Sequence, residues 1–189
     1  MAFLPERDPT TRDRAAALRE ANDSRVIREW MPVVLRWCSR LGSPGIDPED
    51  VAHDVFIVAL RHQDHISDEN RAGWLFGVTR RVLAQHRRRA WFRRWIPGAR
   101  VEATDPSGPD RAYTVNETAR RVQLALLQLP EREREVLVLC VLEERPDSEV
   151  ASMLGIPIGT VKSRLRRARA AFLSVASELG LQSLGRGAE

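Results

Sequence analysis

Cysteine and long apolar runs are scarce in this chain. The 189 residues include only Cys38 and Cys140, each within an apolar helical pattern and without a second cysteine at metal-binding spacing. We predict two buried free thiols. No apolar run approaches the ~20 residues that cross a bilayer, and the N-terminus turns polar almost at once. The sequence therefore predicts no signal peptide, no membrane insertion and a cytoplasmic location.

Lysine is almost missing, because Lys162 is the only one and every other strong base is arginine. The formal net charge is +4, which permits a polyanionic partner. Arginine suits phosphate and guanine recognition, although a GC-rich genome produces the same bias. The charge is compatible with a nucleic-acid partner but does not require one.

Catalytic signatures are also missing: there is no glycine-rich phosphate loop and no nucleophile elbow. His62 and His65 have metal-like spacing, with Asp64 and Asp68 nearby, but they fall on a predicted loop without a remote ligand set. We predict no metal, no cofactor and no catalytic residue. An enzyme acting on nucleic acid is a weak alternative.

Helical periodicity dominates the pattern, since no segment alternates with period two over a strand's length. Apolar residues at three- and four-residue spacing predict helices over residues 24–41, 48–61 and 71–95. Asp47 is the expected N-cap of the second helix. The polar residues 1–22 are expected to be frayed or loosely helical.

A change of composition divides the chain. Residues 97–112 contain three prolines and two glycines and almost no large apolar side chain, which is typical of a flexible linker. We therefore predict an all-α fold of two small helical domains. The expected boundaries are an N-terminal extension 1–23, a first domain 24–95, a linker 96–113, a second domain 114–178 and a disordered tail 179–189.

The second domain carries the strongest local pattern. A helix stopped by Pro130 and a helix over residues 131–144 precede a short helix that Asp147 is expected to cap. Gly155 supplies a turn at positive φ, Ile156 fills the corner, and Pro157 starts the next helix. This order predicts a helix-turn-helix.

The last long helix separates an apolar face from a basic one. Val161, Leu165, Ala168 and Phe172 fall on one side at ~100° per residue. The other side has no acid and offers donors for phosphates and guanine, as a recognition helix in a major groove does. The alternative is a solvated basic helix in an ordinary bundle.

A second basic cluster ends the first domain. Eight arginines and His86 lie between residues 80 and 100 without an acid. The aromatic residues that flank or interleave them are Trp74, Phe76, Trp91, Phe92 and Trp95. Arginines can hold a single strand by its phosphates while aromatic rings stack on unpaired bases. Core packing is the alternative for Trp74 and Phe76.

These segments resemble a known family. LPEREREV from Leu129 and EVASMLGIPIGTVKSRLRRAR from Glu149 are similar to region 4 of extracytoplasmic-function sigma factors. PEDVAHDVF from Pro48 and AGWLFGVTRR from Ala72 are similar to region 2. The similarity covers about residues 24–95 and 114–175. It implies a factor that binds core RNA polymerase and directs promoter-specific initiation.

The resemblance also implies roles for particular residues. Region 4 reads the −35 element, and the residues expected to contact it are Thr160, Lys162, Ser163, Arg164, Arg166, Arg167 and Arg169. Region 2 reads and melts the −10 element, and the residues expected there are His65, Asn70, Trp74, Arg80, Arg81, Gln85, Arg88 and Arg89. The family usually has Asn in place of Arg81 and Asn or Asp in place of Gln85, so no −10 sequence is implied.

The second helix of region 2 is expected to bind polymerase. Its acids and Ile57 form a stripe that suits a basic partner helix, and the resemblance implies the β′ clamp helices as that partner. The expected contact residues are Glu49, Asp50, His53, Asp54 and Ile57, with His53 where the family usually has Gln. The resemblance also implies that region 4 docks on the β flap and that an anti-sigma factor is a further partner. A stand-alone helix-turn-helix regulator, which binds duplex DNA without polymerase, is the alternative.

Overall fold

The computed structural model describes residues 9–62, 67–95 and 117–181 and shows helices without strands in those ranges. The all-α prediction is confirmed. The N-terminal bundle consists of α1 (Pro9–Leu41), α2 (Pro48–His62), the short 3-10 helix η2 (Asp68–Asn70) and α3 (Arg71–Trp95). The C-terminal bundle consists of α4 (Glu117–Gln128), α5 (Glu131–Leu137), the π-helical η3 (Val138–Leu142), α6 (Asp147–Leu154) and α7 (Ile158–Glu178).

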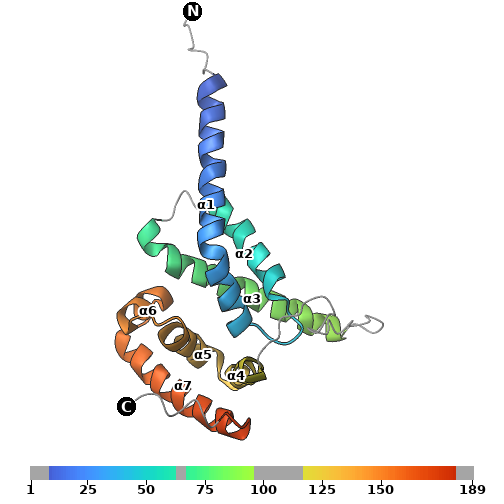
Figure 1. Ribbon diagram of the computed structural model, residues 1–189, viewed down its shortest axis with the longest axis vertical. Helices are drawn as coiled ribbons and strands as arrows, with labels where there is room; N and C mark the ends of the chain where they lie inside the picture. The colour runs from blue at the N-terminus through green and yellow to red at the C-terminus, as the bar shows by residue number, and fades with distance from the viewer. Residues whose placement is uncertain (1–8, 63–66, 96–116, 182–189) are drawn as a thin grey trace, which may run out of the picture.

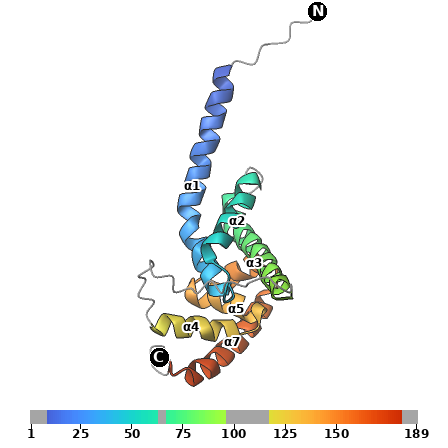
Figure 2. The same ribbon diagram turned by 90° about the vertical axis from the view of Figure 1, so that its right-hand side faces the viewer.

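α1 is longer than the sequence pattern predicts. It begins at Pro9, so a helix already covers residues 9–22, for which the sequence predicts a frayed or loosely helical segment. The frayed alternative is wrong there, and residues 1–8 lie outside the described residues. Ala15, Ala16, Ala17 and their neighbours are strong helix formers, and these propensities extend the helix without an apolar stripe. The N-terminal part of α1 projects from the rest of the molecule (Figures 1 and 2).

The N-terminal bundle is held by α1, α2 and α3 packing on one another. Asp47 caps α2 as predicted, since its Oδ1 accepts the backbone N–H of Glu49 at 2.8 Å. The two largest fully buried side chains, Trp37 of α1 and Phe76 of α3, contact each other with ring centroids 5.1 Å apart in an edge-to-face arrangement. Cys38 is buried beside them.

The C-terminal bundle departs from the predicted helix over residues 131–144. The α-helical part ends at Leu137, and the chain continues as a π-helical turn. Its wider ring is closed by the N–H of Glu143, which donates to the carbonyl of Val138 at 2.9 Å. Glu144 then takes a positive φ of 53°, which ends the helix before α6.

The end of α7 is also more ordered than predicted. Gly180 has a φ of 73°, and the N–H of Leu181 donates to the carbonyl of Ala176 at 2.8 Å, the pattern of a Schellman cap. Leu181 is buried, so the expectation of a disordered tail 179–189 is wrong for its first three residues, Leu179 to Leu181. Residues 182–189 lie outside the described ranges.

The two bundles pack directly against each other. α1 contacts α4, α5 and η3, α3 contacts α6, and one continuous hydrophobic core includes buried residues of both bundles. The backbones approach closely at Gly73 of α3, where a Cβ would lie 3.1 Å from the Cα of Met153. The predicted linker 97–112 and Thr114 lie outside the described residues. Sequence patterns do not predict this packing.

Within the ranges that the structure describes, no helix has the length and apolar character that a membrane span requires.

Two phenylalanines of α3 test the position of the core. Phe76 is fully buried and Phe92 is 61% exposed, so Phe76→Ala is expected to lower the free energy of unfolding by about 3–5 kcal/mol. Phe92→Ala is expected to change it by less than about 0.5 kcal/mol. Urea denaturation followed by circular dichroism measures both values. Similar losses in the two variants contradict this core.

Candidate nucleic-acid interface

The helix-turn-helix consists of α6, the turn at Gly155 and α7. Gly155 has a φ of 63°, as predicted, and the N–H of Ile156 donates to the carbonyl of Ala151 at 3.0 Å. Val150 is buried under the turn. Asp147 is not the cap of α6, because Pro146 occupies that position. The side chain of Asp147 lies near Cys140 instead and contributes to the raised pKa of that thiol.

α7 presents the predicted basic face to solvent. Val161, Leu165 and Ala168 are buried and hold the helix against α5. The exposed basic residues of α7 are Lys162, Arg166, Arg167 and Arg169, and the half-buried positions beside them are Thr160, Ser163 and Arg164. α7 lies on the side of the molecule away from α1 and α2 (Figure 1). The structure therefore brings all seven predicted −35 residues onto or beside one exposed face.

Two contacts of this face are not visible in the sequence. The Nε of Arg167 donates to Glu133 of α5 at 2.9 Å, so this arginine already has an acidic partner. The hydroxyl of Ser163 donates to the carbonyl of Thr160 at 3.0 Å, which turns its proton toward the helix backbone. The side chains of Lys162, Arg166 and Arg169 are exposed to solvent.

The basic residues of α3 divide between two faces of the helix. Arg81, Gln85, Arg88 and Phe92 fall within about 60° of one another at ~100° per residue, and all four are exposed. Arg89 is exposed beside them. Arg80 faces the C-terminal bundle, where its Nε lies 2.5 Å from Oε1 of Glu135. The predicted −10 set is therefore not one surface.

The aromatic residues around this cluster have different environments. Phe76 is buried and Trp74 is half-buried against the core, as the core-packing alternative predicts. Trp91 and Phe92 are 56% and 61% exposed, with ring centroids 5.2 Å apart. At ~100° per residue, Phe92 falls on the face of Arg81 and Arg88, and Trp91 lies about 100° from Phe92 around the helix. Of the five aromatics, Trp91 and Phe92 are therefore the exposed ones; the side chain of Trp95 is outside the described part.

The segment before α3 is only partly described. His65 lies outside the described residues. Asn70 is exposed, and its Nδ2 donates to Oγ of Ser67 at 3.2 Å. The structure places Asn70 at the end of η2, directly before α3.

The outer side of α2 carries the residues predicted to bind polymerase. Glu49, Asp50 and His53 are exposed, and Ile57 is an exposed large apolar residue at 39%. Asp54 belongs to the same stripe, but its Oδ2 lies 2.8 Å from Nε2 of His86 on α3. The surface combines acids with one apolar residue, as the sequence indicates.

No group of three or more potential metal ligands is found among the described residues. His62 turns its Nδ1 to the carbonyl of Val58 at 3.0 Å. Cys38 is buried as predicted, whereas the prediction of burial is wrong for Cys140, which is half-buried. Burial raises the pKa of Cys38 to about 12, and partial burial together with nearby Asp147 raises the pKa of Cys140 to about 11. Both are protonated at neutral pH.

Comparison with known protein families assigns each of the two bundles to a family region. The model of sigma-70 region 2 matches residues 26–93, and that of sigma-70 region 4 matches residues 119–172. The extracytoplasmic-function sigma factor SigL of Mycobacterium tuberculosis is 33% identical over 174 residues, covering 88% of this chain and 96% of SigL. The chain belongs to this family. It is an extracytoplasmic-function sigma factor with region 2 in its N-terminal bundle and region 4 in its C-terminal bundle.

Other relatives agree with this membership. SigE of Mycolicibacterium smegmatis is 32% identical over 148 residues, which cover 76% of this sigma factor and only 57% of SigE. The sigma factor RpoE of Bartonella quintana, solved in complex with the anti-sigma factor NepR, shares the fold with a TM-score of 0.65. The match has 23% identity and covers 82% of this chain and 97% of that one.

The raised pKa values predict unreactive thiols. At about pH 8 the thiolate fraction is roughly one in ten thousand for Cys38 and one in a thousand for Cys140. We expect both thiols of the native protein to react with Ellman's reagent far more slowly than free cysteine, and both to react at once in urea. Rapid labelling of the native protein at either residue contradicts the raised pKa values.

Proposed function

We propose that this sigma factor binds core RNA polymerase in the cytoplasm and directs it to promoters by recognising −35 and −10 elements. The observation that carries the proposal is the pair of family regions, in order, each presenting an exposed basic helix face. The chain supplies binding and positioning, and nucleotide chemistry belongs to the polymerase.

Region 4 reads the −35 duplex in this proposal. α7 enters the major groove with Lys162, Arg166 and Arg169, whose exposed side chains reach base edges and phosphates. Arg167 contributes less than its position suggests, because Glu133 competes for its guanidinium. Thr160, Ser163 and Arg164 lie closer to the bundle and position the backbone of α7.

Region 2 holds the melted −10 strand. Arg81, Arg88 and Arg89 neutralise phosphates along the outer face of α3, and Gln85 lies among them. Trp91 and Phe92 provide exposed rings at the end of the same helix, where unpaired bases can stack. Arg80 and half-buried Trp74 border this surface, and Asn70 and His65 belong to the segment that precedes α3.

Protein partners complete the proposed assembly. Glu49, Asp50, His53 and Ile57 on α2 suit the β′ clamp helices, and region 4 docks on the β flap. Asp54 supports this surface through its contact with His86. Because the related RpoE was solved with an anti-sigma factor, we include an anti-sigma factor among the partners of this chain.

Arg166 provides a test of −35 reading. Arg166→Ala removes an exposed donor of α7 without disturbing the buried face, so we expect transcription from a −35-dependent promoter to fall about tenfold. Arg28→Ala, at an exposed position of α1, is the matched control and is expected to leave transcription unchanged. Pull-down of core polymerase should be equal for both variants. Unchanged transcription by Arg166→Ala refutes the role of this residue.

Trp91 and Phe92 provide a test of strand stacking. The double substitution to Ala removes up to about 1–3 kcal/mol of stacking per base, so permanganate reactivity of thymines at the start site should fall. Trp91→Phe keeps an aromatic ring and is expected to retain most of the reactivity. Full promoter opening by the double variant contradicts a stacking role.

The alternative, a stand-alone regulator, makes a different prediction. Run-off transcription of genomic fragments with core polymerase distinguishes a sigma factor from a stand-alone regulator. A gel shift of the free protein is the second measurement. We expect start-site-specific transcripts only when this sigma factor is present. Tight, sequence-specific binding by the free protein together with no effect on polymerase favours the regulator.

A further inference from the structure

The start of α7 exposes an aliphatic side chain among basic ones. Ile158 is the first residue of α7 and is 46% exposed, whereas Ile156, at the corner before it, packs against the hydrophobic core. At ~100° per residue, Ile158 lies about 20° from Arg169 and about 40° from Lys162 around the helix. Its side chain therefore belongs to the proposed −35 face, although the set predicted from the sequence begins only at Thr160.

The position of Ile158 along α7 separates it from other exposed apolar residues. Single exposed apolar side chains are common on protein surfaces, and Leu173 of the same helix is 58% exposed. Leu173 lies about 60° from Ile158 around α7 but about 22 Å further along its axis. A recognition helix contacts base edges with its N-terminal residues. Of these two side chains, Ile158 is thus the one placed to reach base pairs.

Gly159 indicates that a partner approaches the same turn closely. Glycine destabilises a helix relative to alanine. A Cβ at Gly159 would meet no atom of the described residues within 4 Å, and the residue is helical without a positive φ. Neither packing nor backbone conformation in the described part of the chain therefore requires glycine here. Close approach of another molecule to the first turn of α7 accounts for it.

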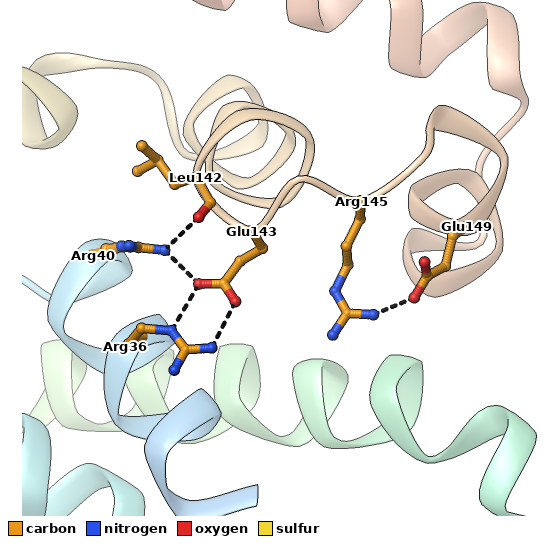
Figure 3. Close-up of polar contacts among 6 residues, drawn as sticks. All are labelled: Arg36, Arg40, Leu142, Glu143, Arg145 and Glu149. Atoms are coloured by element: carbon orange, nitrogen blue, oxygen red, sulfur yellow. Dashed lines mark hydrogen bonds and ion pairs between the residues drawn. The ribbon is translucent and has the colours of Figure 1, made fainter.

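The charges around Ile158 favour a nucleic acid as that molecule. α7 has no acid from Ile158 to Ser177, and Lys162 and Arg169 are exposed on both sides of the aliphatic side chain. Glu149 of the preceding helix α6 is bonded to Arg145 (Figure 3), so its charge is already paired. A duplex offers the matching surface, because phosphates border a major groove whose floor carries the 5-methyl group of thymine.

An aliphatic side chain recognises a base that the basic residues of α7 cannot. Arginine and lysine donate hydrogen bonds to guanine O6 and N7 and to phosphates. They do not detect a methyl group, whereas an apolar side chain gains affinity by burying it. Burial of one methyl group corresponds to about a fourfold change in affinity.

We infer that Ile158 reads a thymine of the −35 element by packing on its 5-methyl group, and that Gly159 allows the first turn of α7 to come close enough for this contact. The inference rests on the proposed function and deepens it. One base pair is recognised by an apolar contact, next to the pairs and phosphates that the basic residues of the same face bind.

Removal of one methyl group from the DNA tests the inference. Deoxyuridine replaces thymine at one position at a time, on either strand of the −35 element, and preserves base pairing and the other groove atoms. Run-off transcription is measured with limiting holoenzyme, formed from core polymerase and this sigma factor. We expect one position at which deoxyuridine lowers transcription about fourfold with the wild-type factor. With Ile158→Ala, the same replacement should have no effect, since the contact is already lost.

Leu173→Ala is the matched control, because it shortens the other exposed aliphatic side chain of α7. It should respond to deoxyuridine as the wild type does. Ile158→Ala should also retain core polymerase in a pull-down. Absence of a position at which Ile158→Ala abolishes the response, the same loss of response in Leu173→Ala, or loss of polymerase binding by Ile158→Ala overturns the inference. Transcription of the unmodified promoter by the wild-type holoenzyme would still support the proposed function in each case.

Gly159→Ala gives a second measurement, in which stability and activity should change in opposite directions. Alanine favours the helix and has open space in the free protein, so the urea midpoint of unfolding should not fall. Transcription from the −35-dependent promoter should fall at least about fivefold, because the added methyl group meets the DNA. Ser177→Ala, at an exposed position near the end of α7, should leave transcription unchanged. Full transcription by Gly159→Ala contradicts the close approach on which the inference depends.

Discussion

Arginine–carboxylate pairing across the two bundles is the interaction on which the arrangement of this protein depends. Glu143 enters a buried position only because Arg36 and Arg40 meet it there. The pairing fixes the end of η3 against α1 and thereby sets the position of α5 along α3. Without these pairs the apolar surface shared by the two bundles would remain, but the polar contacts that fix their relative position would be lost.

α3 then has two roles that its sequence does not separate. One strip of arginines faces region 4, and another faces solvent together with Gln85 and Phe92. An arginine-rich helix can serve both because guanidinium groups bind carboxylates and phosphates with the same planar geometry. The same chemistry that suits a nucleic acid therefore also suits an acidic helix of the same chain.

Local patterns predicted much of this structure. The all-α class, the cap at Asp47, the positive φ of Gly155 and the buried face of α7 all follow from short-range rules of periodicity and backbone conformation. The start of α1 at Pro9 and the π-helical turn after Leu137 could not be read in that way. The start of α1 follows from the helix propensity of its residues, which carry no apolar stripe. The π-helical turn depends on packing against residues far away in the sequence.

The sequence also predicted part of the candidate site, namely its surfaces but not the contacts between helices. The sequence located the basic face of α7, the exposed arginines of α3 and the acidic stripe of α2. It could not show that Glu133 pairs with Arg167, that Asp54 meets His86 or that Glu135 meets Arg80. Each of these partners lies at least one helix away in the chain, and no local pattern encodes such a distance.

The π-helical turn has a consequence for how the chain tolerates change in length. A turn of this kind holds one residue more than an α-helical turn, so loss of a single residue within Val138–Leu142 would allow the helix to close as a regular one. The residues beyond it would keep their orientation around the axis, because the residue lost is the extra one of the π-helical turn. Glu143 would still face Arg36 and Arg40 on α1, so this turn is a place where a one-residue deletion leaves the two halves of the molecule connected.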